Sequence, residues 1–200
     1  EQTQQLALLL KAGALPAPLK ILEERSVGAG LGADSIKAGK LASLVGLLGV
    51  LLVMLVIYRV PGIFANIALL MNLVLVLAVM SAFHSTLTLP GIAGVVVTMG
   101  VAVDANVLIY ERVKEEFGHG RSVLASWQAG FERAFATIWD SHLTNLLSTM
   151  LLFIFGSGSV KGFALSLSIG IITSLFTAIM ITRLQVVVWL KRFKPKTVGF

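Results

Sequence analysis

One carboxylate set inside a long apolar stretch constrains this chain more than any other feature. Between Leu89 and Tyr110 the only charged residue is Asp104. At about 1.5 Å per helical residue, this stretch covers about 33 Å, enough to cross a hydrocarbon layer of about 30 Å. An ionised carboxylate at that depth costs about 2.5–3.5 kcal/mol or more, and intramembrane ionisable groups usually lie on ion or proton pathways. The stretch predicts a membrane helix with a proton-handling site at Asp104; the alternative is a protonated carboxyl that only bonds a neighbouring helix.

Composition places the whole chain among membrane proteins. Of its 200 residues, 56% are hydrophobic and 13% are charged, and the mean hydropathy is +0.91. Soluble domains are nearer to about 45–50% apolar and about 25% charged. The chain contains no cysteine, which excludes a disulfide framework and a thiolate metal site. The net charge of +6 does not indicate nucleic-acid binding, because the basic residues cluster at the ends of apolar stretches.

The apolar stretches predict an all-α membrane protein, a bundle of about five transmembrane helices. The predicted spans lie near residues 34–58, 64–83, 89–111, 139–155 and 162–182. Residues 121–138 have an apolar stripe but are polar elsewhere, which predicts an amphipathic helix resting on the cytoplasmic membrane surface; peptide binding is the alternative. Residues 1–33 cannot bury a core alone, so they predict the end of an extracytoplasmic domain and a hinge, followed by a transmembrane bundle over 34–200.

Charge asymmetry predicts the orientation of this bundle. One side carries Arg59, Arg112, Lys114, Arg121, Arg133, Lys191, Arg192, Lys194 and Lys196, and the other carries Lys37, Lys40 and Lys161. The positive-inside rule places the first set in the cytoplasm. The N-terminal segment is therefore expected to be periplasmic and the C-terminus cytoplasmic.

Polar residues near the predicted site form a second group of candidates. Asn106, Thr144, Asn145 and Ser148 are expected to form a supporting polar site that hydrates Asp104 or shares its proton. Asp140 and His142 are two residues apart and point to different sides of a helix, so we do not expect them to act as a pair. No metal site is predicted, and His84 is interpreted as an interfacial residue.

Small residues recur at helical spacing and predict close helix packing. The candidates for these contacts are Gly46, Gly100, Ser166, Gly170 and Ser174. The last three belong to a stripe of small residues, four apart, that runs from Gly162 to Ala178. This stripe is expected to make the tightest helix contact of the chain.

Three stretches resemble SecD, a family of protein-export membrane proteins in the RND superfamily of proton-driven transporters. They are LPAPLKILEERSVGAGLGADSIKAG (15–39), TLPGIAGVVVTMGVAVDANVLIYERVKEE (88–116) and KGFALSLSIGIITSLFTAIMITR (161–183). They resemble the segment before the second SecD transmembrane helix, the fourth helix and the last helix. The resemblance covers nearly the whole chain and implies one RND-type repeat of the bacterial inner membrane.

The resemblance also implies a function and partners. It implies that Asp104 couples the proton-motive force to preprotein export through the SecYEG channel, with protons as the coupling ion and no other cofactor. It implies a SecF-like subunit that supplies an arginine and a second acid near Asp104, besides contacts with the translocating preprotein and membrane lipid. A large periplasmic domain would precede these residues, so we expect the sequence to start inside a longer protein.

Other functions are compatible with parts of this pattern. An RND-type exporter half for small molecules or lipids would have the same fold, and a scaffold of a membrane complex would have no ion coupling. An intramembrane aspartyl protease needs two facing carboxylates, whereas only Asp104 sits deep in a span.

Overall fold

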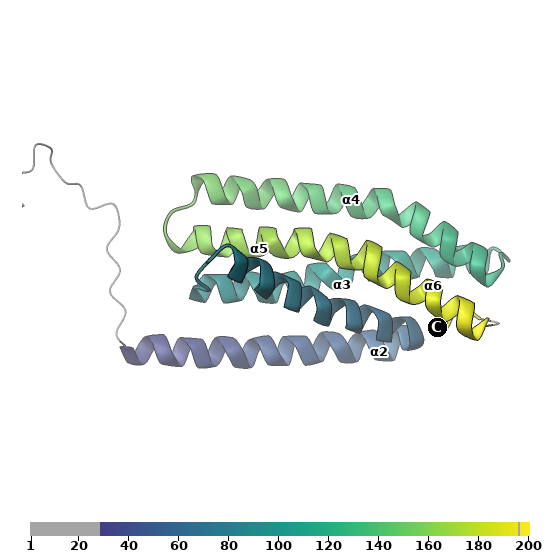
Figure 1. Cartoon of the computed structure of the whole chain (residues 1–200). Helices are drawn as coiled ribbons and strands as arrows, with labels where there is room; N and C mark the ends of the chain where they lie inside the picture. Colours follow the sequence, from purple (N-terminus) through teal and green to yellow (C-terminus); the bar gives the residue numbers. More distant parts are fainter. Residues whose placement is uncertain (1–28, 196) are drawn as a thin grey trace, which may run out of the picture.

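The computed structural model describes residues 29–195 and 197–200, so the predicted segment 1–33 lies almost wholly outside the described residues. The described chain is a bundle of long helices lying side by side (Figure 1). Its elements are α2 (Ala29–Ala82), α3 (Leu89–Gly118), α4 (Val123–Phe155), α5 (Ser159–Phe176), the π-helix η1 (Thr177–Ile181) and α6 (Thr182–Phe193). The prediction of an all-α bundle is confirmed.

Helix α2 reverses direction at Arg59 and forms a hairpin of two antiparallel arms (Figure 1). Arg59 has φ 47° and ψ −113°, a left-handed backbone conformation that breaks the helix. Gly62 lies so close to the carbonyl of Met54 that a Cβ there would collide with it. The Tyr110 hydroxyl of α3 donates to the Pro61 carbonyl at 2.8 Å and holds this bend in place. The two arms correspond to the spans predicted at 34–58 and 64–83.

Helix α4 is one uninterrupted helix of 33 residues, capped at its start by the Ser122 hydroxyl. The prediction of a separate surface helix over 121–138 followed by a span over 139–155 is wrong on this point. No glycine or proline occurs after Gly130 to end the helix before Phe155. Part of the apolar stripe of the predicted surface helix packs inside the protein, where Trp127 and Ile138 are each 1% exposed, whereas Leu124 and Phe135 stay exposed. An amphipathic pattern does not distinguish a membrane surface from a protein surface.

Among the described residues, three helical stretches are long and apolar enough to cross a membrane: Ala33–Ala82, Leu89–Gly118 and Ser159–Phe193. The first contains the reversal at Arg59, and the last joins α5, η1 and α6 without a break. Helix α4 is comparably long but carries more polar residues. The count of five spans therefore stays a prediction.

Helix α3 lies at the centre of the bundle and shares its largest contact with α5. Small residues of the two helices interlock along this contact. A Cβ built on Gly94 would collide with Ser166, and one built on Gly170 would collide with Thr98. The stripe that includes Ser166, Gly170 and Ser174 therefore faces α3 and α4 within the bundle, where these residues are buried.

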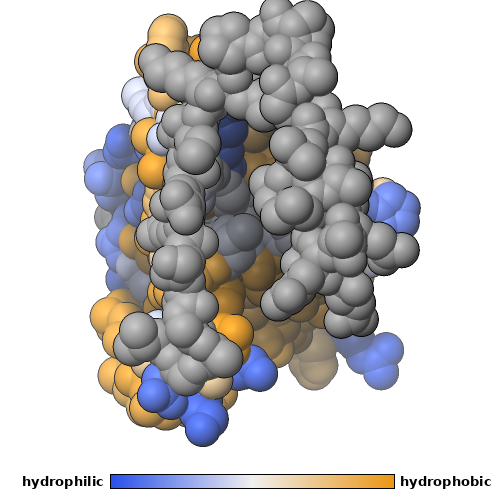
Figure 2. Space-filling view, turned by 90° about the vertical axis from the view of Figure 1, so that its left-hand side faces the viewer, coloured by the Kyte–Doolittle hydropathy of each residue, from blue (hydrophilic) through white to orange (hydrophobic). Residues whose placement is uncertain are grey.

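The first arm of α2 contributes Met54 and Tyr58 to the core, but much of its apolar surface faces outward. Leu41, Val45 and Leu52 are each more than half exposed in the isolated chain, and hydrophobic residues also reach the surface in the end-on view of Figure 2. Contiguous exposed apolar surface of this kind is typical of contact with lipid or with another protein.

A buried carboxylate holds the turn between α3 and α4. The Glu116 side chain is 2% exposed and accepts from Arg121 Nε at 2.9 Å and from Arg133 Nη1 at 2.6 Å. Both arginines are about half exposed, so Glu116 makes two charge-assisted hydrogen bonds across the turn.

We expect Glu116→Gln to destabilise the protein by about 1–3 kcal/mol, because a buried group loses both charged partners while its volume is kept. The measurement is thermal unfolding of the purified protein in detergent. Glu115→Gln is the matched control, since Glu115 is 56% exposed and pairs with Arg112 at the surface. Such surface pairs contribute about 0–1 kcal/mol. Equal melting temperatures for the two variants would contradict a stabilising role for Glu116.

Candidate functional site

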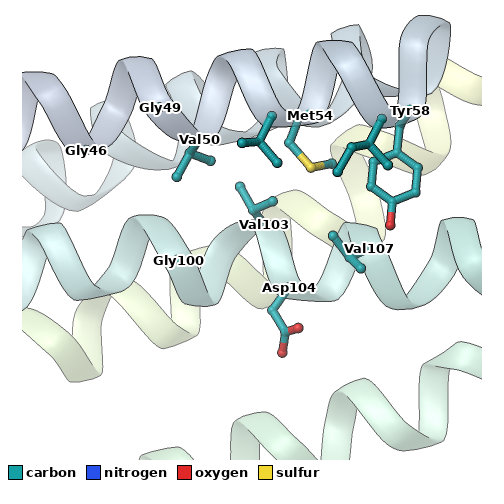
Figure 3. A pocket seen from close by; sticks show the side chains of 11 residues that line it. Gly46, Gly49, Val50, Met54, Tyr58, Gly100, Val103, Asp104 and Val107 are labelled. Carbon is teal, nitrogen blue, oxygen red and sulfur yellow. The ribbon is translucent and has the colours of Figure 1, made fainter.

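Asp104 lies on α3 in a groove between this helix and the first arm of α2. The groove is lined by Gly46, Gly49, Val50, Val53, Met54, Ile57, Tyr58, Gly100, Val103, Asp104 and Val107. Its walls are otherwise almost entirely aliphatic side chains and glycine. In Figure 3 the Asp104 carboxylate points away from Val50 and Met54 of α2.

The Asp104 carboxylate is exposed in the isolated chain. Within residues 29–195 and 197–200, it has no hydrogen-bond donor and no basic side chain in ion-pair contact. An unpaired carboxylate in an apolar stretch needs a donor or cation, because lipid offers neither. The site is therefore incomplete within the described chain.

Gly46 and Gly100 lie in the walls of this groove rather than at a helix contact. A Cβ built on either residue meets nothing within 4 Å. Among the described residues, neither glycine makes the close helix contact that was predicted for it. Small-residue spacing identifies a face that a helix can approach but not which helix approaches it. The structure leaves this face open next to Asp104.

One end of the groove is closed by a polar contact between α2 and α3. The Tyr58 hydroxyl donates to Glu111 Oε1 at 2.9 Å, and Lys114 Nζ donates to the same oxygen at 2.8 Å. Lys114 Nζ also lies 4.8 Å from the centre of the Tyr58 ring. These contacts fix the α2 hairpin against α3 on the Tyr58 side of the groove.

The predicted supporting polar residues do not converge on Asp104. Asn106 is 1% exposed; its Oδ1 accepts from the Thr182 hydroxyl at 2.8 Å and its amide donates to the Ala102 carbonyl. It therefore joins α3 to α6. Thr144 and Ser148 are exposed on α4, and each hydroxyl donates at 2.9 Å to a carbonyl of its own helix. Asn145 is half-buried on the same helix.

His142 is a buried polar group outside the predicted site. It is 4% exposed on α4. Its Nδ1 lies 2.9 Å from the Ile138 carbonyl and its Nε2 lies 3.2 Å from Ser174 Oγ on α5. The spacing of His142 from Ile138, on the buried stripe of α4, is the signal that could have identified it. Asp140 is exposed, as expected for a residue on another side of the helix.

Comparisons with known proteins agree with this architecture. Residues 12–192 match the family described as "Protein export membrane protein SecD/SecF, C-terminal". The protein translocase subunit SecD of Rickettsia bellii is 58% identical over 199 residues, which cover 100% of this chain and 39% of the relative. SecD of Acetobacter pasteurianus is 52% identical over 195 residues, which cover 98% of this chain and 37% of the relative.

A solved structure shows the same fold. The crystal structure of SecDF from Thermus thermophilus, described as a translocon-associated membrane protein, matches with a TM-score of 0.85 and 38% identity. The match covers 98% of this chain and 27% of that one. The chain thus spans less than two-fifths of the length of these relatives. The resemblance seen in the sequence is confirmed.

Proposed function

Because this chain belongs to the SecD/SecF family of protein-export membrane proteins, we propose that it is the transmembrane part of a SecD subunit that uses the proton-motive force. It assists export of preproteins through the SecYEG channel of the bacterial inner membrane. Protons are the coupling ion, and Asp104 is the residue that binds and releases them.

The observation that carries this proposal is that Asp104, in an open apolar groove, has no charged partner among the residues that the structure describes. Apolar surroundings favour the protonated carboxyl, and a cation facing it favours the carboxylate. Moving a cation to or from the site would therefore release or load a proton. One unit charge that crosses a potential of 100 mV is worth about 2.3 kcal/mol. That energy is sufficient to bias a conformational equilibrium of a few kcal/mol.

A SecF-like subunit is the partner that completes the groove. Transporter sites of this kind lie between two repeats, and this chain supplies one. Gly46 and Gly100 leave room for a helix of the second repeat to approach the groove. That helix would bring the cation that Asp104 lacks among the described residues of this chain.

Two other functions make different demands on the same groove. A half-transporter for small molecules or lipids would keep proton coupling at Asp104 but would not change protein export. A scaffold without ion coupling would tolerate loss of the carboxylate. One experiment separates the proposed function from both alternatives. Only the proposed function predicts that Asp104→Asn removes the part of preprotein export that a proton uncoupler abolishes.

The proposed orientation places the turn between α3 and α4 in the cytoplasm and the turn between α4 and α5 in the periplasm. His119 and Ser157 are exposed in these two turns, and the chain contains no cysteine. A cysteine at His119 is expected to resist a membrane-impermeant thiol reagent in intact cells, whereas one at Ser157 reacts. Both react after the membrane is opened. Labelling of the His119 cysteine in intact cells, with protection of the Ser157 cysteine, would reverse the orientation.

A further inference from the structure

A second groove, separate from the one at Asp104, plays no part in the proposed function. It has a volume of about 490 Å³ and lies between the start of α4 and the end of α6, which are at the same end of the bundle (Figure 1). That volume falls within the range of about 300–1,000 Å³ that is usual for ligand sites. This basic groove is lined by Ser122, Val123, Leu124, Val187, Leu190, Lys191, Lys194 and Pro195.

Much of the lining of the basic groove is aliphatic. Val123 and Leu124 come from α4, and Val187 and Leu190 come from α6. Leu124 is 65% exposed, so the described part of the chain leaves this apolar surface uncovered. Exposed apolar surface is typical of contact with lipid or with another molecule.

The charged residues of the basic groove are both lysines. Lys191 and Lys194 are three residues apart at the end of α6, and both are exposed. Lys194 ends the helix in a left-handed conformation (φ 42°, ψ 56°), and its N–H donates to the Leu190 carbonyl at 3.1 Å. Among the described residues, neither amine is in an ion pair and no acidic residue lines the groove. The groove therefore holds two positive charges that lack a counter-charge in the described chain.

An exposed apolar stripe leads from the membrane-spanning part of the chain to the basic groove. Its residues are four apart along the continuous helical stretch of α5, η1 and α6, which is long and apolar enough to cross a membrane. Each of them is half or more exposed: Ile172, Phe176, Met180, Leu184 and Val188. Residues three or four apart are neighbours on a helix, so Leu184 adjoins Val187, and Val188 adjoins Lys191. The groove is thus continuous with the surface that we expect to contact acyl chains.

We propose that the basic groove binds one anionic phospholipid, such as phosphatidylglycerol. The phosphate lies against Lys191 and Lys194, and an acyl chain lies along Leu124 and Val187. An anionic lipid supplies both the negative charge that the amines lack and the apolar chain that covers the aliphatic walls. A soluble phosphate would leave those walls in water, and a zwitterionic phospholipid would leave the positive charges uncompensated. The apolar stripe favours a ligand from the bilayer over an acidic protein segment.

The test is photocrosslinking of the full-length protein with its partner subunit, reconstituted in bilayers of phosphatidylethanolamine and phosphatidylglycerol. The probe is phosphatidylglycerol with a diazirine in one acyl chain, and mass spectrometry of the peptides locates the crosslinks. We expect crosslinks at Leu124 and Val187. Unlabelled phosphatidylglycerol should compete for them, whereas phosphatidylcholine and inorganic phosphate should not.

Removal of both lysine charges tests the contact with the phosphate. The double variant Lys191→Gln, Lys194→Gln is expected to bind the probe about 25-fold more weakly, since each lysine near an anionic lipid contributes a factor of about five. The matched control is Lys37→Gln with Lys40→Gln. It removes two exposed lysines at the same spacing near the start of α2, which begins at the opposite end of the bundle (Figure 1). Crosslinking in the control should stay at the parental level.

A bulky side chain in the groove tests the contact with the acyl chain. Val187→Trp fills the apolar part and keeps both lysines; Val187 is 39% exposed, so the larger ring can extend outward without disturbing the core. This variant is expected to lose the crosslink at Leu124 while its melting temperature stays at the parental value. A patch that attracts lipid by charge alone would keep that crosslink.

Several results would overturn the lipid site. Groove crosslinks that persist in the Lys191 and Lys194 double variant, or equal competition by phosphatidylcholine, would exclude an anionic site. Displacement of the probe by inorganic phosphate would assign the groove to a soluble anion. If no groove crosslink forms and a cysteine at Leu124 instead crosslinks to the partner subunit, the groove is a protein interface. None of these results depends on Asp104, so the lipid site and proton coupling can fail separately; the proposed orientation only assigns the lipid to the cytoplasmic leaflet.

Discussion

Asp104→Asn is expected to abolish the part of preprotein export that depends on the proton-motive force, while expression and assembly with the partner subunit remain at the parental level. Asparagine keeps the shape of the side chain and removes its titration. The groove around the residue is aliphatic and glycine-lined, so a neutral amide fits at least as well as a carboxyl. The loss should therefore appear in coupling and not in folding.

The measurement compares export into sealed membrane vesicles with and without an uncoupler. In the parental protein, we expect the uncoupler to slow export; in Asp104→Asn, export should start at the uncoupled rate and not change. Asp34→Asn is the matched control, because Asp34 is exposed near the start of the α2 hairpin and does not line the groove. An Asp104→Asn protein that keeps the full response to the uncoupler would leave this residue as a structural contact.

Gly170→Leu is expected to disrupt the bundle by more than about 3 kcal/mol, above the usual range for an overpacked site. Even a Cβ at this position collides with the side chain of Thr98 on α3, which is itself buried. The helix cannot rotate to relieve the collision, because Gly94 and Ser166 interlock in the same way one turn earlier on each helix. We expect a low yield of monodisperse protein in size-exclusion chromatography and a large drop in melting temperature, although α5 still inserts into the membrane.

The same substitution at two other glycines provides the comparison for Gly170→Leu. Gly118→Leu places the same side chain at an exposed helix end, where a Cβ meets nothing within 4 Å, and should behave like the parent. Gly46→Leu should leave the subunit itself stable and weaken its association with the SecF-like partner, because we propose that this partner docks in the open groove. Normal stability of Gly170→Leu would show that the contact between α3 and α5 is looser than described.

The sequence alone was sufficient for features that depend on local chemistry. The predicted spans 34–58 and 64–83 leave a short gap that contains Pro61 and Gly62, and α2 reverses direction next to this gap, at Arg59. The stretch from Leu89 to Tyr110, in which Asp104 is the only charged residue, predicted an apolar helix that carries this carboxylate. The stripe through Gly170 predicted a close helix contact, since glycine permits an approach that larger side chains prevent.

Features that depend on which surfaces meet could not be read in this way. The stripe through Trp127 matches a membrane surface and a protein core equally well, so the continuity of α4 was missed. Gly46 has the same spacing signal as Gly170 but faces an open groove. Asn106 lies two residues from Asp104, yet on a helix that separation turns its side chain to α6. His142 was assessed against Asp140, its neighbour in sequence, whereas its partner Ser174 lies 32 residues away.

The π-helical turn η1 helps to keep one stripe of buried residues on the same face along the continuous helical stretch formed by α5, η1 and α6. Ser166, Gly170, Ser174, Ala178, Thr182 and Val186 follow one another at intervals of four residues, and all are buried. In a regular α-helix, four residues turn through about 400°, so each step drifts by about 40° and the stripe winds around the rod. A π-turn is wider, with each bond closed over five residues, and it takes up part of that drift. The Thr182 hydroxyl donates to Asn106 Oδ1 of α3 at 2.8 Å and lies 3.4 Å from the Thr177 carbonyl, so the end of the π-turn is joined to the helix that carries Asp104. A rotation of α6 relative to α5 must therefore change the geometry of the π-turn. Through the bond between Thr182 and Asn106, the same rotation would also displace α3.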